Sequence, residues 1–222
     1  MNTDMVFDPS EPEIDMNSFQ HQDWSYFIYS SPGEELKEAL PPNMPKPLGH
    51  GFKICCFVDA DHAGESLTRR SRTGFIVMLN NAPIYWHSKK QTSVETSTFG
   101  SEMMEMKKSA GYIRGFRYKL RMFGIPVVKL SYMCGDNQSV LAGSTRPEYT
   151  LKKKAQSIAF HFIWEGCAAD EWRTTYINTW ENISDLMTKP LSGEKRWRLV
   201  RMLLRHIWCG RWRSQRGCWQ RV

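Results

Sequence analysis

The spacing of hydrophobic positions changes several times along this chain, and each spacing predicts a different element. Apolar side chains run without interruption through "FKICCFVDA" (52–60), which predicts a buried strand, and "DADHAG" then predicts a turn. The segments "TGFIVML" (73–79) and "IYWHS" (84–88) follow as further strands, separated by the turn "NNAP". Because these connections are short, we expect the strands to form an antiparallel meander.

A helical spacing begins after residue 96. One face is marked by apolar residues that lie mostly three or four positions apart: Met106, Ala110, Ile113, Leu120 and Phe123. Ser97 or Thr98 can cap the start of this helix, and Gly124 is typical of its end. Glu102 stands in the first turn and on the apolar face. A carboxylate in that position is costly unless a cation or a strong donor meets it.

The second half of the chain alternates between strands and helices. We expect a strand at "VVKLSYMC" (127–134), closed by "GDNQSV", and a helix through "LKKKAQSIAFHFIWEGCAAD" (151–170). A strand at "EWRTTYIN" (171–178) and a short helix within "NISDLMTKPL" (182–191) complete the pattern. The order βββαβαβα predicts an α/β fold with a five-stranded mixed sheet flanked by helices.

The pattern divides the chain into three parts. Residues 1–48 are acidic and then proline-rich, as in "EALPPNMPKPLG", which predicts a linker or the end of a larger protein. We expect the folded domain over 49–191 and a basic C-terminal helix and tail over 192–222.

Composition narrows the classes of protein. The 222 residues carry a net charge of +7 with a pI of about 9.1, which suits a nucleic-acid partner. We expect no membrane partner and an intracellular location, cytoplasmic or nuclear, because there is no long apolar run and no secretory signal. The six cysteines form no CxxC pair, which favours buried thiols in a reducing compartment.

Four carboxylates stand at element ends: Asp59, Glu102, Asp136 and Asp185. If the first and fourth strands are neighbours, these side chains can converge on one rim, where they repel each other unless divalent cations neutralise them. Oxygen ligands of this kind select Mg²⁺ or Mn²⁺. Two such ions can activate water and stabilise the leaving oxygen of a phosphodiester. Taken singly, each carboxylate could instead be a turn residue or a helix-dipole partner.

Four motifs in order, "FVDADHAG", "YWHSKKQTSVETSTFGSE", "GDNQSV" and "ISDLMTKPL", resemble the ribonuclease H region of copia-type retrotransposon polyproteins over roughly residues 36–208. The resemblance implies the ribonuclease H-like fold and hydrolysis of the RNA strand of RNA–DNA hybrids with two Mg²⁺ ions, for which Mn²⁺ can substitute. It implies that Asp59, Glu102, Asp136 and Asp185 are the catalytic and metal-binding residues. Asp61 is interpreted as turn-forming or supporting, and Glu105 as a solvated helix residue.

The chain departs from the family pattern in two places. The loop "NTWENIS" carries Trp180 and no histidine, although cellular ribonucleases H commonly have one there. A Tyr-x-Asp-Asp polymerase signature is also missing, so the chain resembles the C-terminal piece of a polyprotein, with residues 1–48 as a linker or a polymerase remnant. The rest of that polyprotein is then a possible partner. The alternative is a catalytically inactive, degenerate nucleic-acid-binding fragment.

Basic residues predict where a hybrid would bind. Arg69, Arg70 and Arg72 stand in one turn, and Lys89, Lys90 and Gln91 in another; contacts of lysine and arginine with phosphates require no base sequence. Asn137 and Gln138 are placed to bond ribose 2′-hydroxyls. Arg114, Arg117 and Arg121 form a helical stripe. The alternative for all of these groups is a solvated basic surface.

A second enzyme class, the retroviral-type integrases, uses two aspartates and a glutamate on the same fold. Asp59, Asp136 and Glu171 approximate that spacing. However, Glu171 stands at the very start of a predicted strand, whereas the integrase glutamate lies on a helix, and no His-His-Cys-Cys module precedes the domain. The sequence therefore argues against an integrase.

Overall fold

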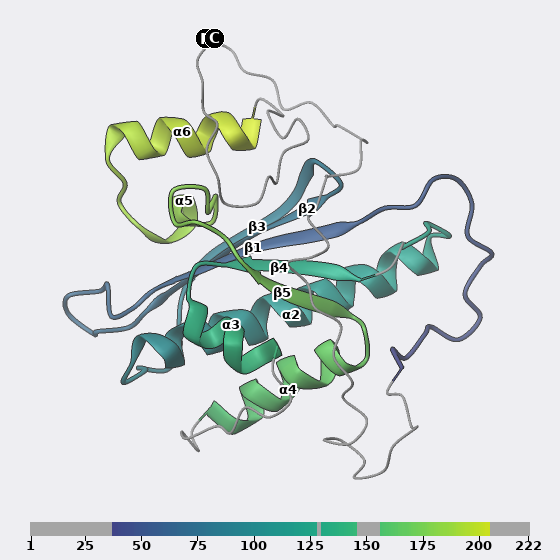
Figure 1. The fold of residues 1–222 in the computed structure, drawn as a ribbon, viewed down its shortest axis with the longest axis horizontal. Helices are drawn as coiled ribbons and strands as arrows, with labels where there is room; N and C mark the ends of the chain where they lie inside the picture. Colours follow the sequence, from purple (N-terminus) through teal and green to yellow (C-terminus); the bar gives the residue numbers. More distant parts are fainter. Residues whose placement is uncertain (1–36, 128–129, 146–155, 205–222) are drawn as a thin grey trace.

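The structure is a computed structural model that describes residues 37–127, 130–145 and 156–204 (Figure 1). Its centre is a five-stranded sheet in the order β3-β2-β1-β4-β5. The strands β1 (Ile54–Asp61), β2 (Arg72–Leu79) and β3 (Ala82–Lys90) pair antiparallel, which confirms the predicted meander. The strands β4 (Ser131–Gly135) and β5 (Trp172–Tyr176) continue the sheet, and both run parallel to β1.

Helices cover both faces of this sheet. Figure 1 shows α2 (Thr98–Met122), α3 (Gln138–Thr145) and α4 (Ser157–Ala168) on one face, and α5 (Asp185–Thr188) with α6 (Gly193–Leu204) on the other. Each face has its own hydrophobic cluster. This arrangement is the α/β fold that the sequence predicted, with a five-stranded mixed sheet flanked by helices.

The burial of β1 explains its continuous apolar sequence. Cys56 and Val58 face the cluster under α2, whereas Cys55 and Phe57 face the cluster under α5 and α6. Side chains alternate between the faces of a strand, so a strand covered on both faces needs apolar residues at every position. The described cysteines, Cys55, Cys56, Cys134 and Cys167, are free and buried; Cys209 and Cys218 lie outside the described residues.

The ends of α2 agree with the sequence prediction, but the position of Glu102 does not. The Ser97 hydroxyl accepts a hydrogen bond from the Gly100 amide at 3.2 Å, and Gly124 has a positive φ of 71° beyond the C-terminal end. Glu102 is the fifth residue of the helix, and the first turn holds no acidic residue. A carboxylate that complements the helix dipole would lie in the first turn. Glu102 lies beyond that turn.

The second half of the chain differs more from the prediction. The helix α3 was not predicted; Asn137 starts it, because its side-chain oxygen accepts hydrogen bonds from the amides of Ser139 (3.2 Å) and Val140 (3.3 Å). The predicted strand at 127–134 begins only at Ser131. Residues 128–129, 146–155 with the lysines at 152–154, and 205–222 lie outside the described residues. Within the described part of the chain, no helix is long and apolar enough to cross a membrane.

Candidate active site

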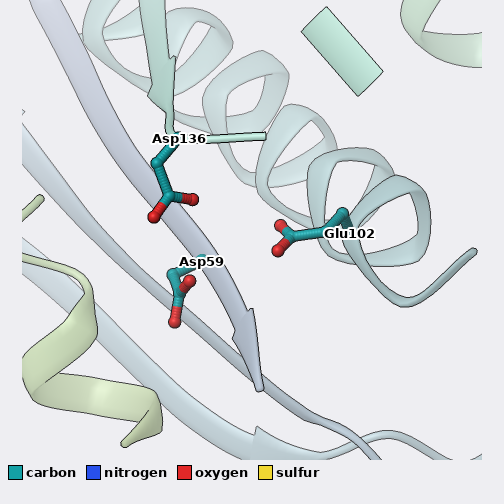
Figure 2. Close-up of side chains that lie close together, drawn as sticks. All are labelled: Asp59, Glu102 and Asp136. Atoms are coloured by element: carbon teal, nitrogen blue, oxygen red, sulfur yellow. The ribbon is translucent and has the colours of Figure 1, made fainter. Parts of the chain in front are cut away.

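Three acidic residues from separate elements meet at one end of the sheet (Figure 2). Asp59 lies near the end of β1, Asp136 directly follows β4, and Glu102 projects from α2. One carboxylate oxygen from each residue lies within 4.8 Å of the other two. Parallel pairing of β1 with β4 brings their carboxyl ends to the same edge, and α2 packs across β1. The fold therefore creates an acidic group from residues far apart in the chain.

Two members of the group, Asp59 and Glu102, are buried, Asp136 is half buried, and the protein supplies too little positive charge to neutralise the three carboxylates. Asp59 is fully buried and Glu102 is 7% exposed. Burial raises the pKa of Asp59 to about 6, with a further increase from Asp185 and an opposing effect of Lys189. Burial, followed by the charges of Asp59 and Asp136, raises the pKa of Glu102 well above its usual value. A hard divalent cation fits this donor set, because it would neutralise carboxylates that otherwise repel each other.

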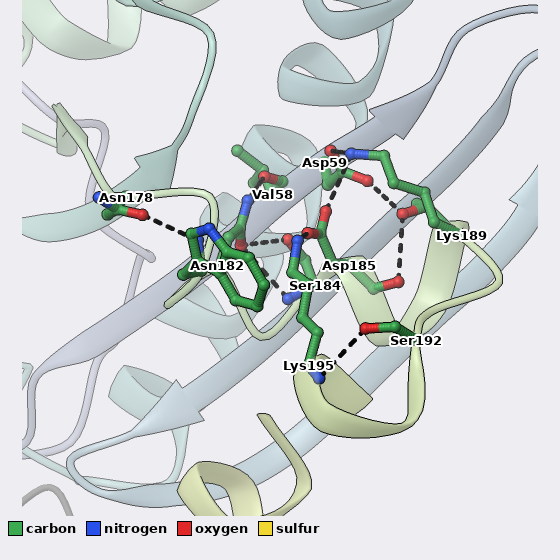
Figure 3. A network of polar contacts seen from close by, with 11 residues as sticks. Val58, Asp59, Asn178, Asn182, Ser184, Asp185, Lys189, Ser192 and Lys195 are labelled. Carbon is green, nitrogen blue, oxygen red and sulfur yellow. Dashed lines mark hydrogen bonds and ion pairs between the residues drawn. The ribbon is translucent and has the colours of Figure 1, made fainter. Parts of the chain in front are cut away.

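Asp185 is close to Asp59 but lies outside the group of three carboxylates. The Lys189 ammonium joins the two aspartates, at 2.8 Å from Asp59 Oδ1 and 2.9 Å from Asp185 Oδ1 (Figure 3). Lys195 forms a second salt bridge with Asp185, and the Thr188 hydroxyl donates to Asp59. The sequence prediction missed these partners. The spacing of four between Asp185, which starts α5, and Lys189, which directly follows it, was the signal that could have revealed Lys189.

A loop anchored to β1 holds Asp185 in place. The Asn182 side-chain amide donates to the Val58 carbonyl at 2.9 Å, and its oxygen accepts from the Ser184 amide at 3.3 Å (Figure 3). Both asparagine and serine are fully buried. Trp180, where cellular ribonucleases H commonly have a histidine, is half exposed, with the Lys195 ammonium 5.7 Å from its ring centroid. The loop is thus a fixed support for the aspartate pair.

An open cleft of about 770 Å³ gives access to the carboxylates. Glu102, Asp136 and Lys189 line it, together with the predicted ribose-binding residues Asn137 and Gln138. The remaining lining residues are Ala60, Asp61, His62, Thr98 and Tyr176, of which the sequence prediction included only Asp61. Gln138 is exposed, whereas Asn137 is half buried and also caps α3. A polar substrate can therefore approach the acidic group from solvent.

Glu105 corrects a sequence prediction. It was expected to be solvated, but its side chain is fully buried, and among the described residues neither carboxylate oxygen has a hydrogen-bond partner. Burial, together with the charges of Glu102 and Asp59, raises its pKa well above the usual value. The apolar face of α2 is wider than predicted and includes this position.

We expect Glu105→Leu to stabilise the protein at neutral and alkaline pH. A raised folded-state pKa means that stability is greatest below the unfolded pKa, about 4.3, and falls as the pH rises towards the folded value. In the wild type, Glu105 should lower the free energy of unfolding by up to about 1.4 kcal/mol for each pH unit in this range, and the substitution should abolish that decrease. Urea unfolding between pH 5 and pH 8 measures the slope. Glu165→Leu, on the exposed side of α4, controls for the added apolar side chain. An unchanged slope in Glu105→Leu would contradict the assignment.

The basic residues of the predicted interface lie at the same end of the sheet as the carboxylates. Arg72 is the first residue of β2 and pairs with Asp61 on one side and Lys90 on the other. Lys89 pairs with Thr73, which pairs with Ala60. Two strand spacings, about 10 Å, therefore separate Lys89 from the end of β1. Arg69 and Arg70 are exposed in the preceding turn, and Lys90 forms a salt bridge with Glu65.

Gln91 is not a surface residue, contrary to the prediction that it binds nucleic acid. It is 8% exposed, and its amide donates to the Thr73 hydroxyl at 3.1 Å and the Ser101 carbonyl at 2.9 Å. These bonds attach the residue after β3 to β2 and to α2. The sequence placed Lys89, Lys90 and Gln91 together in a turn. Lys89 and Lys90 instead belong to β3, so the strand ends later than predicted.

The arginine stripe of α2 is engaged in salt bridges. Arg114 donates two hydrogen bonds to Glu171, at 2.7 and 2.6 Å. Arg117 and Arg121 both bind Glu38. The three arginines therefore form neither a phosphate-binding stripe nor a solvated surface, the two alternatives that the sequence left open. Glu171 precedes β5, at the opposite end of the sheet from Asp136, so it cannot complete an integrase-like triad.

Known proteins show related sequences. No family model matches the chain. The retrovirus-related Pol polyprotein from transposon RE1 of Arabidopsis thaliana is 28% identical over 144 residues, which is 65% of this chain and 10% of that protein. The corresponding polyprotein from transposon TNT 1-94 of Nicotiana tabacum is 27% identical over 175 residues, or 74% of this chain and 13% of that protein. The chain is homologous to a segment of retrotransposon Pol polyproteins.

The chain spans only about a tenth of the length of the curated relatives it matches. The finding confirms the resemblance to retrotransposon polyproteins that the four sequence motifs indicated. Among solved structures, ribonuclease H1 from the halophilic archaeon Halobacterium salinarum NRC-1 superimposes with a TM-score of 0.48 at 11% identity, covering 61% of this chain and 94% of that one.

Proposed function

We propose that this chain is a metal-dependent ribonuclease H that hydrolyses the RNA strand of RNA–DNA hybrids. The observation that supports the proposal is the group formed by Asp59, Glu102 and Asp136, in which one carboxylate oxygen of each residue lies within 4.8 Å of the other two. Three carboxylates so close together need a counter-cation, and they line or border an open cleft. Asp185 belongs to the same acidic set through its contact with Lys189.

Each residue of the chain has a distinct part in the proposed reaction. Asp59, Glu102 and Asp136 would hold Mg²⁺ or Mn²⁺ by their oxygens. The bound cation would supply a water of lowered pKa and stabilise negative charge on the phosphodiester. Asn137 and Gln138 line the cleft, where their amides can bond a ribose 2′-hydroxyl and so select RNA over DNA. Arg69, Arg70, Arg72, Lys89 and Lys90 would hold phosphates without reading the base sequence.

Digestion of a labelled RNA–DNA hybrid tests the function. We expect the RNA strand to be cut with Mg²⁺ or Mn²⁺ and to remain intact in EDTA, because the acidic group needs its counter-charge. Ca²⁺ should bind and support little turnover, since its looser coordination suits the reaction poorly. Double-stranded DNA of the same sequence is the matched control and should not be cut. Equal cleavage in EDTA, or no cleavage with any of the cations, would contradict the proposal.

The basic residues give a separate prediction about binding. We expect alanine at Arg69, Arg70, Lys89 and Lys90 to weaken hybrid binding and flatten its salt dependence. Each lost phosphate contact should reduce the slope of log K against log salt by about 0.9 or somewhat less. The single-turnover rate at saturation should change little, because these side chains do not line the cleft with the carboxylates. Binding titrations from 50 to 200 mM salt measure the slope. Over this range, the affinity of a protein with many phosphate contacts falls by about 10³-fold.

A matched variant removes the same positive charge elsewhere. It replaces exposed cations that do not line the cleft, Lys37, Lys119, Arg196 and Arg201, with alanine. This variant should keep most of the wild-type salt slope, because net charge alone does not create phosphate contacts. If both variants lose the same slope, the basic end of the sheet is not the binding surface.

A further inference from the structure

The protein supplies cations to one part of its acidic site and leaves the other part without them. Both oxygens of Asp185 are occupied, Oδ1 by Lys189 at 2.9 Å and Oδ2 by Lys195. The same Lys189 ammonium lies 2.8 Å from Asp59 Oδ1. Within the described residues, no hydrogen bond or salt bridge reaches the carboxylate of Glu102. Asp59 therefore belongs to a lysine-bridged pair with Asp185, and it also belongs, with Glu102 and Asp136, to the group that still needs a cation.

The lysine bridge is a built feature of the fold. Lys189 directly follows α5, four residues after Asp185, so that its side chain returns over the helix towards the aspartate. Asp59 and Asp185 are fully buried, whereas the Lys189 side chain is 32% exposed and reaches them from the cleft. Two buried carboxylates without a bridging cation would repel each other strongly. An ammonium group at this point performs the neutralising task that a metal ion would otherwise perform.

We propose that Lys189 takes the place of a second metal ion between Asp59 and Asp185, so that the free protein binds one divalent cation, at Asp59, Glu102 and Asp136. The inference rests on the proposed metal-dependent function and changes its stoichiometry, because the family resemblance implied two ions. It makes Lys189 a positioning residue that holds the aspartate pair together. In the protein without substrate, Asp185 then binds Lys189 and is not a ligand of the metal ion.

Counting bound ions in the full chain tests this directly. We expect Mn²⁺ titrations, followed by calorimetry and by loss of the free-ion paramagnetic resonance signal, to give one ion per chain in the wild type. Lys189→Met keeps the length of the side chain without its charge and should bind two. Lys189→Arg retains the cation and should bind one. Lys195→Met is the matched control, since Lys195 contacts Asp185 and not Asp59; it should also bind one.

The outcomes separate this inference from the proposed function. Two ions in the wild type, or one in both the wild type and Lys189→Met, would overturn the role of Lys189 and leave metal binding in place. No Mn²⁺ binding by either protein would overturn the metal site as well.

A second pair of variants decides the question if Lys189→Met does not fold. We expect Glu102→Gln to lower the affinity for the single Mn²⁺ ion by about tenfold or more, since loss even of supporting groups costs that much. Asp185→Asn should leave the affinity unchanged, because its carboxylate is bonded to lysines and not to the ion. Equal losses in the two variants would make Asp185 a ligand and overturn the inference.

Discussion

Glu102→Gln is expected to abolish hybrid cleavage while the protein remains folded. Glutamine keeps the shape of the side chain but removes a charge from a group whose oxygens lie within 4.8 Å of one another. If metal-supplied charge stabilisation contributes several kcal/mol, its loss lowers the rate by about a thousandfold, since about 1.4 kcal/mol corresponds to a factor of ten. The relief of repulsion from Asp59 and Asp136 should keep the metal-free stability level or raise it.

Two measurements on this variant distinguish a metal ligand from a structural residue. The increase in melting temperature on adding Mg²⁺ should shrink, because a ligand stabilises a protein only in proportion to its affinity. Glu194→Gln, an exposed glutamate in the first turn of α6, is the isosteric control and should retain both cleavage and the Mg²⁺ effect. A stable and fully active Glu102→Gln protein would remove Glu102 from the site.

Arg117→Met is expected to cause the largest loss of stability, about 3–5 kcal/mol in the free energy of unfolding. The Arg117 side chain is 2% exposed and donates to Glu38 at 2.8 and 2.6 Å and to Ser131 at 3.0 Å. Burial alone would raise the pKa of Glu38, but hydrogen bonds from Arg117 and Arg121 lower it to about 2. Removal of Arg117 leaves the partly buried Glu38 carboxylate with Arg121 as its remaining arginine partner, which is the main source of the expected cost.

Denaturant unfolding measures this loss, and the pH dependence identifies its cause. The lowered pKa of Glu38 gives stability that is present above the unfolded pKa of about 4.3 and is lost as the pH falls towards the folded value. Arg117→Met should reduce this acid-dependent contribution. Arg121→Met, at the more exposed partner of the same glutamate, is the control and should cost less. If Arg117→Met lost less free energy of unfolding than Arg121→Met, the result would contradict a structural role for the buried Arg117.

The salt bridge also concerns the extent of the domain. Glu38 lies before residue 49, where the sequence predicted the domain to begin, yet it is attached to α2 through Arg117 and Arg121. The Leu48 amide also donates to the Gly124 carbonyl at 2.9 Å. We therefore expect a fragment that begins at residue 49 to be less stable than one that begins at residue 37, as measured by thermal unfolding.

The sequence by itself determined the elements whose signals are local. The apolar run of β1 required burial on both faces, and the pair Ser97 and Thr98, of which Ser97 is the cap, together with Gly124 marked the ends of α2. The ends of β1 and β4 also placed Asp59 and Asp136 correctly on one edge, because neighbouring parallel strands carry their carboxyl ends together. These features depend on side-chain period and backbone preference, which are properties of short segments.

Only the tertiary structure decided which polar residues are buried and which cation each carboxylate meets. Glu105 and Gln91 have no local signal for burial; they are covered because α2, β1 and β3 pack together. Arg117 meets Glu38 across 79 positions of the chain, and Lys189 meets Asp59 across 130. Charges so far apart along the chain interact only when the packed fold fixes their distance and excludes water. The same charged residues in the sequence are therefore compatible with a solvated surface and with an internal salt bridge.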